Sequence, residues 1–142
     1  MLVSTKGRYA IRVMLELAKH NREGYTALAD VAKEQEISEK YLESIISILS
    51  RSGLVEGLRG KGGGYRLTRE PDLYTIGEIL RLTEGTLAPV ACLECLPNKC
   101  SRATECKTLP MWEKLDKIIS DYLDGITLED LLNNEDVGNY QI

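Results

Sequence analysis

Apolar residues return at every third or fourth position along several stretches of this chain, a spacing typical of helices with one buried face. It predicts helices at Thr5–Lys19, Ala27–Glu34, Glu39–Arg51, Thr75–Arg81, Leu109–Leu123 and Leu128–Asn133. Two short runs, Leu54–Leu58 and Gly64–Thr68, favour strands, and the glycine-rich loop 59–63 joins them into a hairpin. The pattern predicts a fold that is mainly α with a small β-hairpin.

Residues suited to helix capping stand where several of these helices begin. Ser4 or Thr5 is expected to cap the first helix, Thr26 is expected to cap the second, and Ser38 is expected to cap the third. A hydroxyl there accepts a hydrogen bond from the unpaired amides of the first turn. Thr127 and Asp130 have the spacing of a capping box for the last helix.

The third predicted helix has an unusual polar side. Its outer positions carry short hydrogen-bonding residues where a solvated helix usually mixes Glu with Lys; they are Lys40, Glu43, Ser44, Ser47, Ser50 and Arg51. A helix, a short helix, a four-residue turn, this polar-faced helix and a basic hairpin follow one another. That order is typical of a winged helix-turn-helix, which binds DNA.

The charge is divided unevenly along the chain, although the net charge of -4 argues at first against nucleic acid. Residues 1–69 carry 12 Lys and Arg against 8 Asp and Glu, whereas residues 70–142 carry 6 against 14. Only the first half therefore suits a phosphate backbone. We expect double-stranded DNA to be bound there.

Two segments supply the expected DNA contacts. The start of the third helix would meet base edges in the major groove, through Ser38, Lys40, Tyr41 and Glu43. The hairpin, called the wing here (residues 54–68), would meet the backbone or the minor groove through Arg59, Gly60, Lys61 and Arg66. Phosphates repel a carboxylate, so Glu43 is expected to discriminate between bases by accepting from a cytosine amino group.

Three stretches of the chain, Ser4–Ala18, Ile37–Leu67 and Tyr74–Leu93, resemble the Rrf-type winged-helix regulators. The most specific of the shared motifs is RGKGGGY at residues 59–65, and the similarity covers essentially the whole chain. The resemblance implies a transcriptional regulator that forms homodimers through a long C-terminal helix, here Leu109–Leu123.

The four cysteines, Cys92, Cys95, Cys100 and Cys106, all lie within fifteen residues. Clustered thiols in a reducing compartment are more often metal or redox groups than disulfides. Their C-x2-C-x4-C-x5-C spacing lacks the second short knuckle of most structural zinc sites, whereas iron-sulfur clusters accept irregular spacings. The spacing favours a cluster with all four as ligands and leaves zinc and a thiol-disulfide switch as alternatives.

The resemblance sharpens this prediction and also shows a departure. The cluster-binding branch of the family has a C-x5-C-x5-C pattern, and Cys100 and Cys106 match its last two positions. Its first position falls on Glu94, and the histidine that follows its last cysteine is replaced by Leu109. The resemblance implies [2Fe-2S] in preference to [4Fe-4S], and it leaves open whether Cys92, Cys95 or both are ligands.

The long C-terminal helix carries more apolar surface than a small DNA-binding domain needs to cover. We expect it to pack against a second copy through Trp112, Leu115, Ile118, Ile119 and Tyr122. The expected domains are a winged helix-turn-helix head at 1–84, a cysteine-rich cluster-binding loop at 85–107, and a dimerisation helix with an acidic tail at 108–142.

Other functional classes find little support in the sequence. The chain has one histidine, His20, so a Ser/His/Asp catalytic set is not expected, and no phosphate loop follows a strand. No apolar run approaches the roughly 20 residues of a membrane span, and we expect a cytoplasmic protein without a small-molecule substrate. The favoured function is a repressor of iron-sulfur cluster assembly genes; the alternative is a thiol- or zinc-sensing regulator, for example of cysteine metabolism, or a protein-interaction module.

Overall fold

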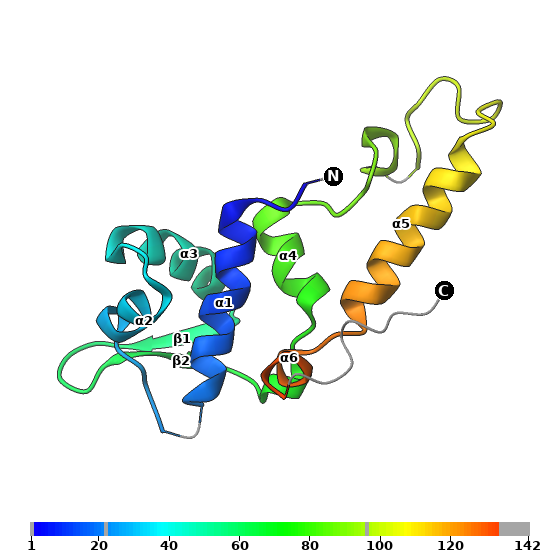
Figure 1. Cartoon of the computed structure of the whole chain (residues 1–142). Helices are drawn as coiled ribbons and strands as arrows, with labels where there is room; N and C mark the ends of the chain where they lie inside the picture. The colour runs from blue at the N-terminus through cyan, green and yellow to red at the C-terminus, as the bar shows by residue number, and fades with distance from the viewer. Residues whose placement is uncertain (1, 22, 96, 134–142) are drawn as a thin grey trace.

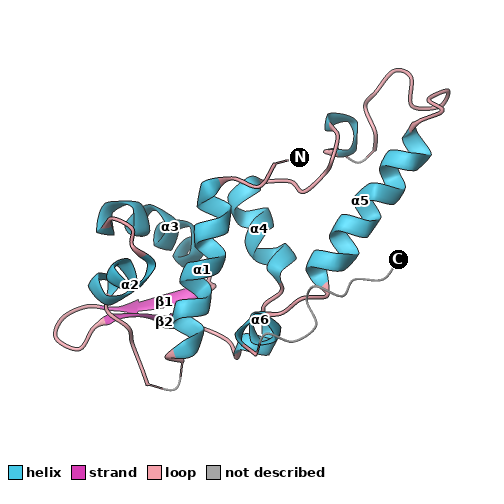
Figure 2. Cartoon of the chain, viewed as in Figure 1, coloured by secondary structure: helices cyan, strands magenta, loops and turns pink. Residues whose placement is uncertain are grey.

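The elements of the computed structural model, which describes residues 2–21, 23–95 and 97–133, follow the predicted order. Its helices are α1 (Thr5–Lys19), α2 (Leu28–Gln35), α3 (Glu39–Arg51), α4 (Ile76–Glu84), α5 (Leu109–Asp124) and α6 (Leu128–Leu132). Strands β1 (Val55–Leu58) and β2 (Gly64–Leu67) pair antiparallel, and two 3-10 turns, η1 (Pro71–Leu73) and η2 (Ala91–Leu93), complete the described elements. The predicted fold class is confirmed (Figures 1 and 2).

Local capping sets where most of the helices begin. The Ser4 hydroxyl accepts from the amide of Gly7 at 3.0 Å, and the Ser38 hydroxyl accepts from the amide of Tyr41 at 3.1 Å. The capping box before α6 is present with both of its hydrogen bonds. These contacts satisfy amides that have no partner inside the helix.

The start of α2 differs from the prediction. This helix begins after Ala27, which makes no side-chain cap, so the expected Thr26 cap is wrong. Thr26 instead forms an isolated β-bridge with Tyr65, in which each residue donates its amide to the carbonyl of the other, at 2.8 and 2.9 Å. This bridge ties the wing to the chain that enters α2.

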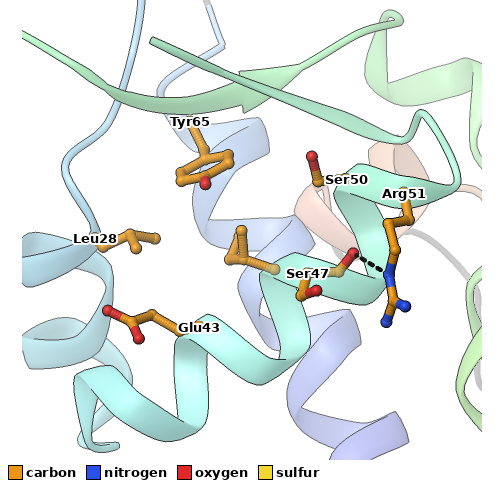
Figure 3. Close-up of a pocket in the computed structure, with 7 residues that line it drawn as sticks. Leu28, Glu43, Ser47, Ser50, Arg51 and Tyr65 are labelled. Atoms are coloured by element: carbon orange, nitrogen blue, oxygen red, sulfur yellow. Dashed lines mark hydrogen bonds between the residues drawn. The ribbon is translucent and has the colours of Figure 1, made fainter. Parts of the chain in front are cut away.

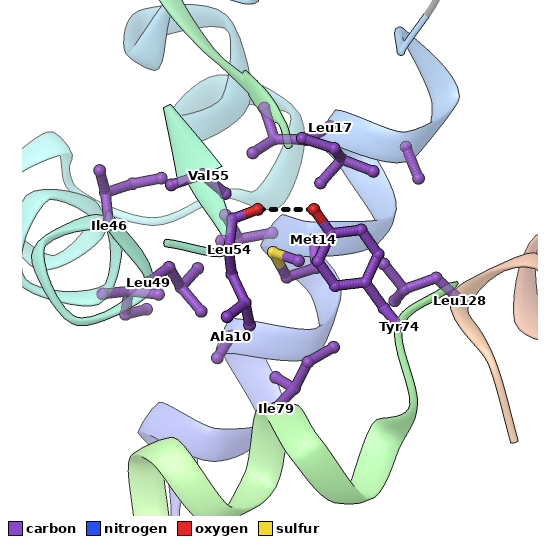
Figure 4. Packing of buried hydrophobic residues seen from close by; sticks show 14 of the residues in the cluster. Ala10, Met14, Leu17, Ile46, Leu49, Leu54, Val55, Tyr74, Ile79 and Leu128 are labelled. Carbon is purple, nitrogen blue, oxygen red and sulfur yellow. Dashed lines mark hydrogen bonds between the residues drawn. The ribbon is translucent and has the colours of Figure 1, made fainter. Parts of the chain in front are cut away.

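One apolar core holds the winged helix-turn-helix together, with α1 at its centre (Figure 4). The core side chains come from α1, α2, α3, α4, α6 and the base of the wing; among them are Ala10, Met14, Leu17, Leu49, Leu54, Tyr74, Ile79 and Leu128. α1 packs against α4, α6 and β2 along its length. α3 and the wing are therefore fixed to one frame.

Only Ile119 and Leu123 of α5 pack against this core, within the part of the chain that the structure describes. The helix contributes no buried residue and runs away from the rest of the chain (Figure 1). Its C-terminal end is held to α4 by Arg81, whose two guanidinium nitrogens lie 2.6 and 3.1 Å from the Asp124 carboxylate oxygens. Gly77 faces this carboxylate, and a side chain there would collide with it.

α6 turns the chain back onto the core, where Leu128 is fully buried. The predicted acidic tail lies beyond it, outside the described residues. Within the part of the chain that the structure describes, every helix is too short or too polar to cross a membrane.

Candidate nucleic-acid interface and cysteine loop

The outer side of α3 is open to solvent at the positions predicted to meet DNA. Leu42, Ile45 and Leu49 are buried and hold the helix against the core. Lys40 and Glu43 are exposed and make no hydrogen bond or ion pair with the described residues. Both side chains are therefore available to a ligand.

Ser38 and Tyr41 have structural roles as well. The Ser38 hydroxyl caps α3, and the half-buried Tyr41 ring lies edge-on to Tyr9 of α1, with 5.9 Å between ring centroids. Ser44 turns inward, because its hydroxyl donates to the Tyr41 carbonyl at 2.6 Å. The structure thus places the predicted residues together at the start of α3. Lys40 and Glu43 have no partner among the described residues, whereas Ser38 and Tyr41 also make contacts within the protein.

A cavity of about 250 Å³ lies between α3 and the wing (Figure 3). Its lining extends from Glu43 to the C-terminal end of α3, where the Arg51 side chain donates to the Ser47 carbonyl at 3.2 Å. The complete lining is Leu28, Glu43, Ile46, Ser47, Ser50, Arg51 and Tyr65. A second cavity, of about 470 Å³, continues from the same side chains along the wing loop.

Ser47, Ser50 and Arg51 line this cavity although the sequence pattern did not predict them as DNA contacts. Their spacing contains the signal, since they lie four, seven and eight residues after Glu43 and so share its helix face. Tyr65 and Leu28 had no such signal, because tertiary packing alone brings them to this cavity. We call the surface formed by the two cavities the α3–wing groove.

The wing loop projects from the end of the hairpin, with Arg59, Gly60 and Lys61 all exposed (Figure 1). Neither basic side chain forms an ion pair within the described residues. Gly60 and Gly62 adopt φ values of 95° and 77°, a region that favours glycine. The glycines therefore permit the tight turn that presents these two charges.

Arg66 lies on the other face of the hairpin. Successive strand residues point to opposite faces, so Arg66 faces away when its neighbour Tyr65 faces α3. Its guanidinium lies 2.6 Å from the Glu56 carboxylate and 4.5 Å above the Tyr25 ring, and the Glu56 hydrogen bond raises the pKa of Arg66. The structure does not bring Arg66 into the α3–wing groove, and its predicted DNA contact stays a prediction.

The cysteine loop (residues 85–107) joins α4 to α5 at the end of the molecule away from the wing (Figure 1). All four thiols are free, with Cys95 and Cys100 exposed and Cys92 and Cys106 half-buried. A hydrogen bond with the Thr108 side chain, at 3.3 Å, lowers the pKa of Cys106. This favours the thiolate, the form that binds metals.

The structure does not assemble the four cysteines into one site. Across residues 2–21, 23–95 and 97–133, no three His, Cys, Asp or Glu side chains are grouped closely enough to hold a metal ion. The donor set suits a soft metal or an iron-sulfur cluster, because thiolates are the preferred ligands of both. Such ligation would require the loop to close around the metal.

The exposed face of α5 carries the apolar residues predicted for a dimer interface. Leu115 is 37% exposed and Met111 is 54% exposed. Trp112, Ile118, Ile119 and Tyr122 are half-buried. The exposed apolar side chains of Leu115 and Met111 are typical of an interface with another molecule.

Comparison with known proteins settles the family. Residues 3–134 match the Rrf2 family, described as an iron-dependent transcriptional regulator. The chain belongs to the Rrf2 family. It is therefore a transcriptional regulator and not an enzyme, as the sequence predicted.

Two groups of Rrf2 relatives resemble the chain to a similar degree. The transcriptional regulator CymR of Bacillus subtilis is 41% identical over 136 residues, which cover 96% of this chain and 93% of the relative. The transcriptional regulator IscR of Erwinia tasmaniensis is 37% identical over 137 residues, which cover 96% and 82%. The resemblance to the family is confirmed.

Among solved structures, those of CymR and IscR proteins also resemble this chain. The structure of CymR, the global cysteine regulator of B. subtilis, has a TM-score of 0.79 at 40% identity and covers 96% of this chain and 99% of that one. The structure of T. potens IscR has a TM-score of 0.76 at 38% identity, with coverage of 100% and 94%. The winged helix-turn-helix prediction is thereby confirmed, and regulators of this family bind DNA and are dimeric.

Proposed function

We propose that this Rrf2 regulator binds operator DNA as a homodimer and senses iron-sulfur status through a cluster held by the cysteine loop. On this proposal it represses genes for iron-sulfur cluster assembly and acts in the cytoplasm, where operator DNA lies. The observation that supports this proposal most strongly is that the loop joining the DNA-binding head (residues 1–84) to α5 holds four free thiols in a stretch of fifteen residues.

The α3–wing groove supports the DNA-binding part. Among the residues that the structure describes, Lys40 and Glu43 at the start of α3 and Arg59 and Lys61 at the wing tip have no ion-pair partner. A helix fits the major groove of B-DNA, and a projecting hairpin reaches the neighbouring backbone or minor groove. The two segments can therefore contact one DNA site together, with α3 reading bases and the wing holding phosphates.

The chemistry of the loop supports the cluster. Cys92, Cys95, Cys100 and Cys106 would hold it, and a bound [2Fe-2S] or [4Fe-4S] cluster would supply a redox-active centre that iron supply and oxygen affect. We favour [2Fe-2S] from the family resemblance. Most of the loop is irregular, with η2 as its only short helical turn among the described residues. It can therefore close around a cluster without unfolding a long element.

The position of the loop supports a sensing role. It begins at the end of α4 in the head and ends at the start of α5, the proposed dimerisation helix. A ligand shifts a conformational equilibrium only by binding the two states differently. A loop that closes on the cluster meets this condition, since its ends would move relative to each other and change how α5 leaves the head.

The test is anaerobic purification of the full chain followed by determination of iron, acid-labile sulfide and zinc. We expect a coloured protein with iron and sulfide in equal amounts and little zinc. Zinc in place of iron, or metal-free protein that binds its operator with the same preference under all conditions, would contradict the cluster.

A regulator of cysteine metabolism is the second candidate. The observation in its favour is that CymR of B. subtilis is 41% identical to the chain, against 37% for IscR of E. tasmaniensis. In this case the loop thiols would act as a redox switch or a zinc site. The same metal determination separates the two, because the second candidate predicts protein without acid-labile sulfide.

A further inference from the structure

Tyr74 lies between the wing and α4, and it is completely buried. Its hydroxyl donates to the Leu54 carbonyl at 2.7 Å, the bond drawn in Figure 4. The same oxygen accepts from the amides of Thr68 and Arg69, at 2.9 and 3.0 Å. One buried side chain thus holds both open ends of the hairpin.

The backbone at Tyr74 is tied in the opposite direction, to α6. Its carbonyl accepts from the Leu128 amide at 3.1 Å. The next residue, Thr75, forms a β-bridge with Thr127, and the Ile76 amide donates to the Ile126 carbonyl at 2.9 Å. The segment therefore joins the base of the wing to the corner where α5 meets α6.

The buried side chains of Leu54, Val55 and Leu67 and the Thr26–Tyr65 bridge also anchor the base of the wing, whereas the wing loop at residues 59–62 is exposed. Each strand has four residues, and three of the four in β1 are exposed. A two-stranded hairpin is marginally stable without packing or other anchors. The hydrogen bonds of the Tyr74 hydroxyl lie at the point where a small change of angle would move the wing tip furthest.

We propose that Tyr74 is a positioning residue for DNA binding: its hydroxyl sets the direction of the wing relative to α4 and α6 and so places Arg59 and Lys61 on the DNA backbone. This inference builds on the proposed DNA-binding function. Tyr74 contacts no DNA itself and acts through the wing.

The first experiment measures amide hydrogen exchange in the full chain carrying Tyr74→Phe, which keeps the ring and removes the hydroxyl. The Thr68 and Arg69 amides and those of Gly64–Leu67 should exchange roughly tenfold faster, while α1 and α3 stay protected, since a buried hydrogen bond is lost at one point. Unchanged exchange in the wing would overturn the proposal.

The second experiment is a double-mutant cycle on a DNA duplex selected by the wild-type chain. Tyr74→Phe should weaken binding roughly five- to tenfold, which corresponds to about 1 to 1.4 kcal/mol. In a chain that already carries Arg59→Ala and Lys61→Ala, Tyr74→Phe should weaken binding no further, because the two wing side chains that it positions are absent. An equal loss in both backgrounds would show general destabilisation of the head and would overturn the proposal.

Two further variants serve as a control and as a second test of the Tyr74→Phe result. Tyr9→Phe is the matched control, because the Tyr9 hydroxyl makes no hydrogen bond with the described residues, and it should leave exchange in the wing unchanged. Thr68→Val removes the bond from the Thr68 hydroxyl to the Gly53 carbonyl, at 2.7 Å, and should loosen the wing in the same direction if Tyr74→Phe proves unstable. Failure of the wild-type chain to bind any duplex would refute the proposed function, whereas the exchange experiment tests the Tyr74 contacts separately.

Discussion

Glu43 is the acidic residue in the lining of the α3–wing groove, and it has no partner among the described residues. The other side chains that line the groove include serines, Arg51, Arg59 and Tyr65, and none of them is paired with Glu43. A carboxylate in a surface that binds phosphates weakens binding unless a base satisfies it. Substitution of Glu43 is therefore the most direct way to separate base recognition from binding to the phosphate backbone.

Glu43→Ala should broaden the range of operators that the protein binds. Binding should strengthen by roughly 1 to 3 kcal/mol at sites where the carboxylate met only acceptors. The measurement is competition over a randomised duplex library at fixed salt. Glu39→Ala, on the same helix but outside the groove lining, is the control and should leave the preference as it is. Unchanged sequence preference in Glu43→Ala would mean that α3 does not read bases there.

Arg59→Ala should weaken binding to most sequences alike, because the proposed role of the wing is to hold phosphates. The slope of log affinity against log salt should fall by about 0.9 for the lost phosphate contact. Titration of one duplex at several salt concentrations measures this. Arg66→Ala is the informative comparison: paired with Glu56 on the far face of the hairpin, Arg66 should change the slope less. An unchanged slope for Arg59→Ala would place the wing off the DNA.

The cysteine loop is joined to the core at its start by the buried Leu87, but its four cysteines lie outside the apolar core. Replacing one of them therefore removes no core side chain. The helix α1 packs directly against α4 and α6, so we expect these contacts to be kept when a cysteine is replaced.

Cys100→Ala or Cys106→Ala should abolish the iron and sulfide content and leave helix content and dimer mass unchanged. Iron and sulfide determination after anaerobic purification, beside circular dichroism and light scattering, gives the three quantities. Ser101→Ala, in the same loop, is the control and should keep the cluster. Full cluster occupancy in either cysteine variant would refute the ligand set.

The elements that the sequence predicted well are those with local causes. α1 and α3 have the predicted bounds, because a capping serine and an apolar stripe lie in the same few residues. Thr26 shows the limit of this reasoning, since its backbone pairs with Tyr65, almost forty residues away in the sequence. The same limit applies to the site: the groove lining of Tyr65 and Leu28 and the opposite direction of Arg66 depend on how the hairpin packs.

For the whole molecule, the proposed dimerisation through α5 is what would make two heads act together. Ile119 packs partly against the core of its own chain, whereas Ile118 does not. A charge at Ile118 therefore probes the contact with a second copy more cleanly than a charge at Ile119.

Ile118→Glu should give monomers whose heads stay folded. Binding to a two-site operator should weaken roughly 100-fold or more, because the second head loses its tether. Light scattering and DNA titration measure the two effects, and Lys114→Glu, at an exposed polar position of α5, should leave both unchanged. A stable dimer of Ile118→Glu would show that the interface lies elsewhere.

On the proposed function, the state of the cysteine loop sets which DNA the two heads bind. Anaerobic selection from a randomised duplex library tests it most directly, with the same preparation used as isolated and after removal of iron by a chelator. We expect two different sets of preferred sequences for the wild-type chain, and one shared set when Cys100→Ala is selected under both conditions. Identical preferences and affinities for the wild-type chain with and without its cluster would contradict it.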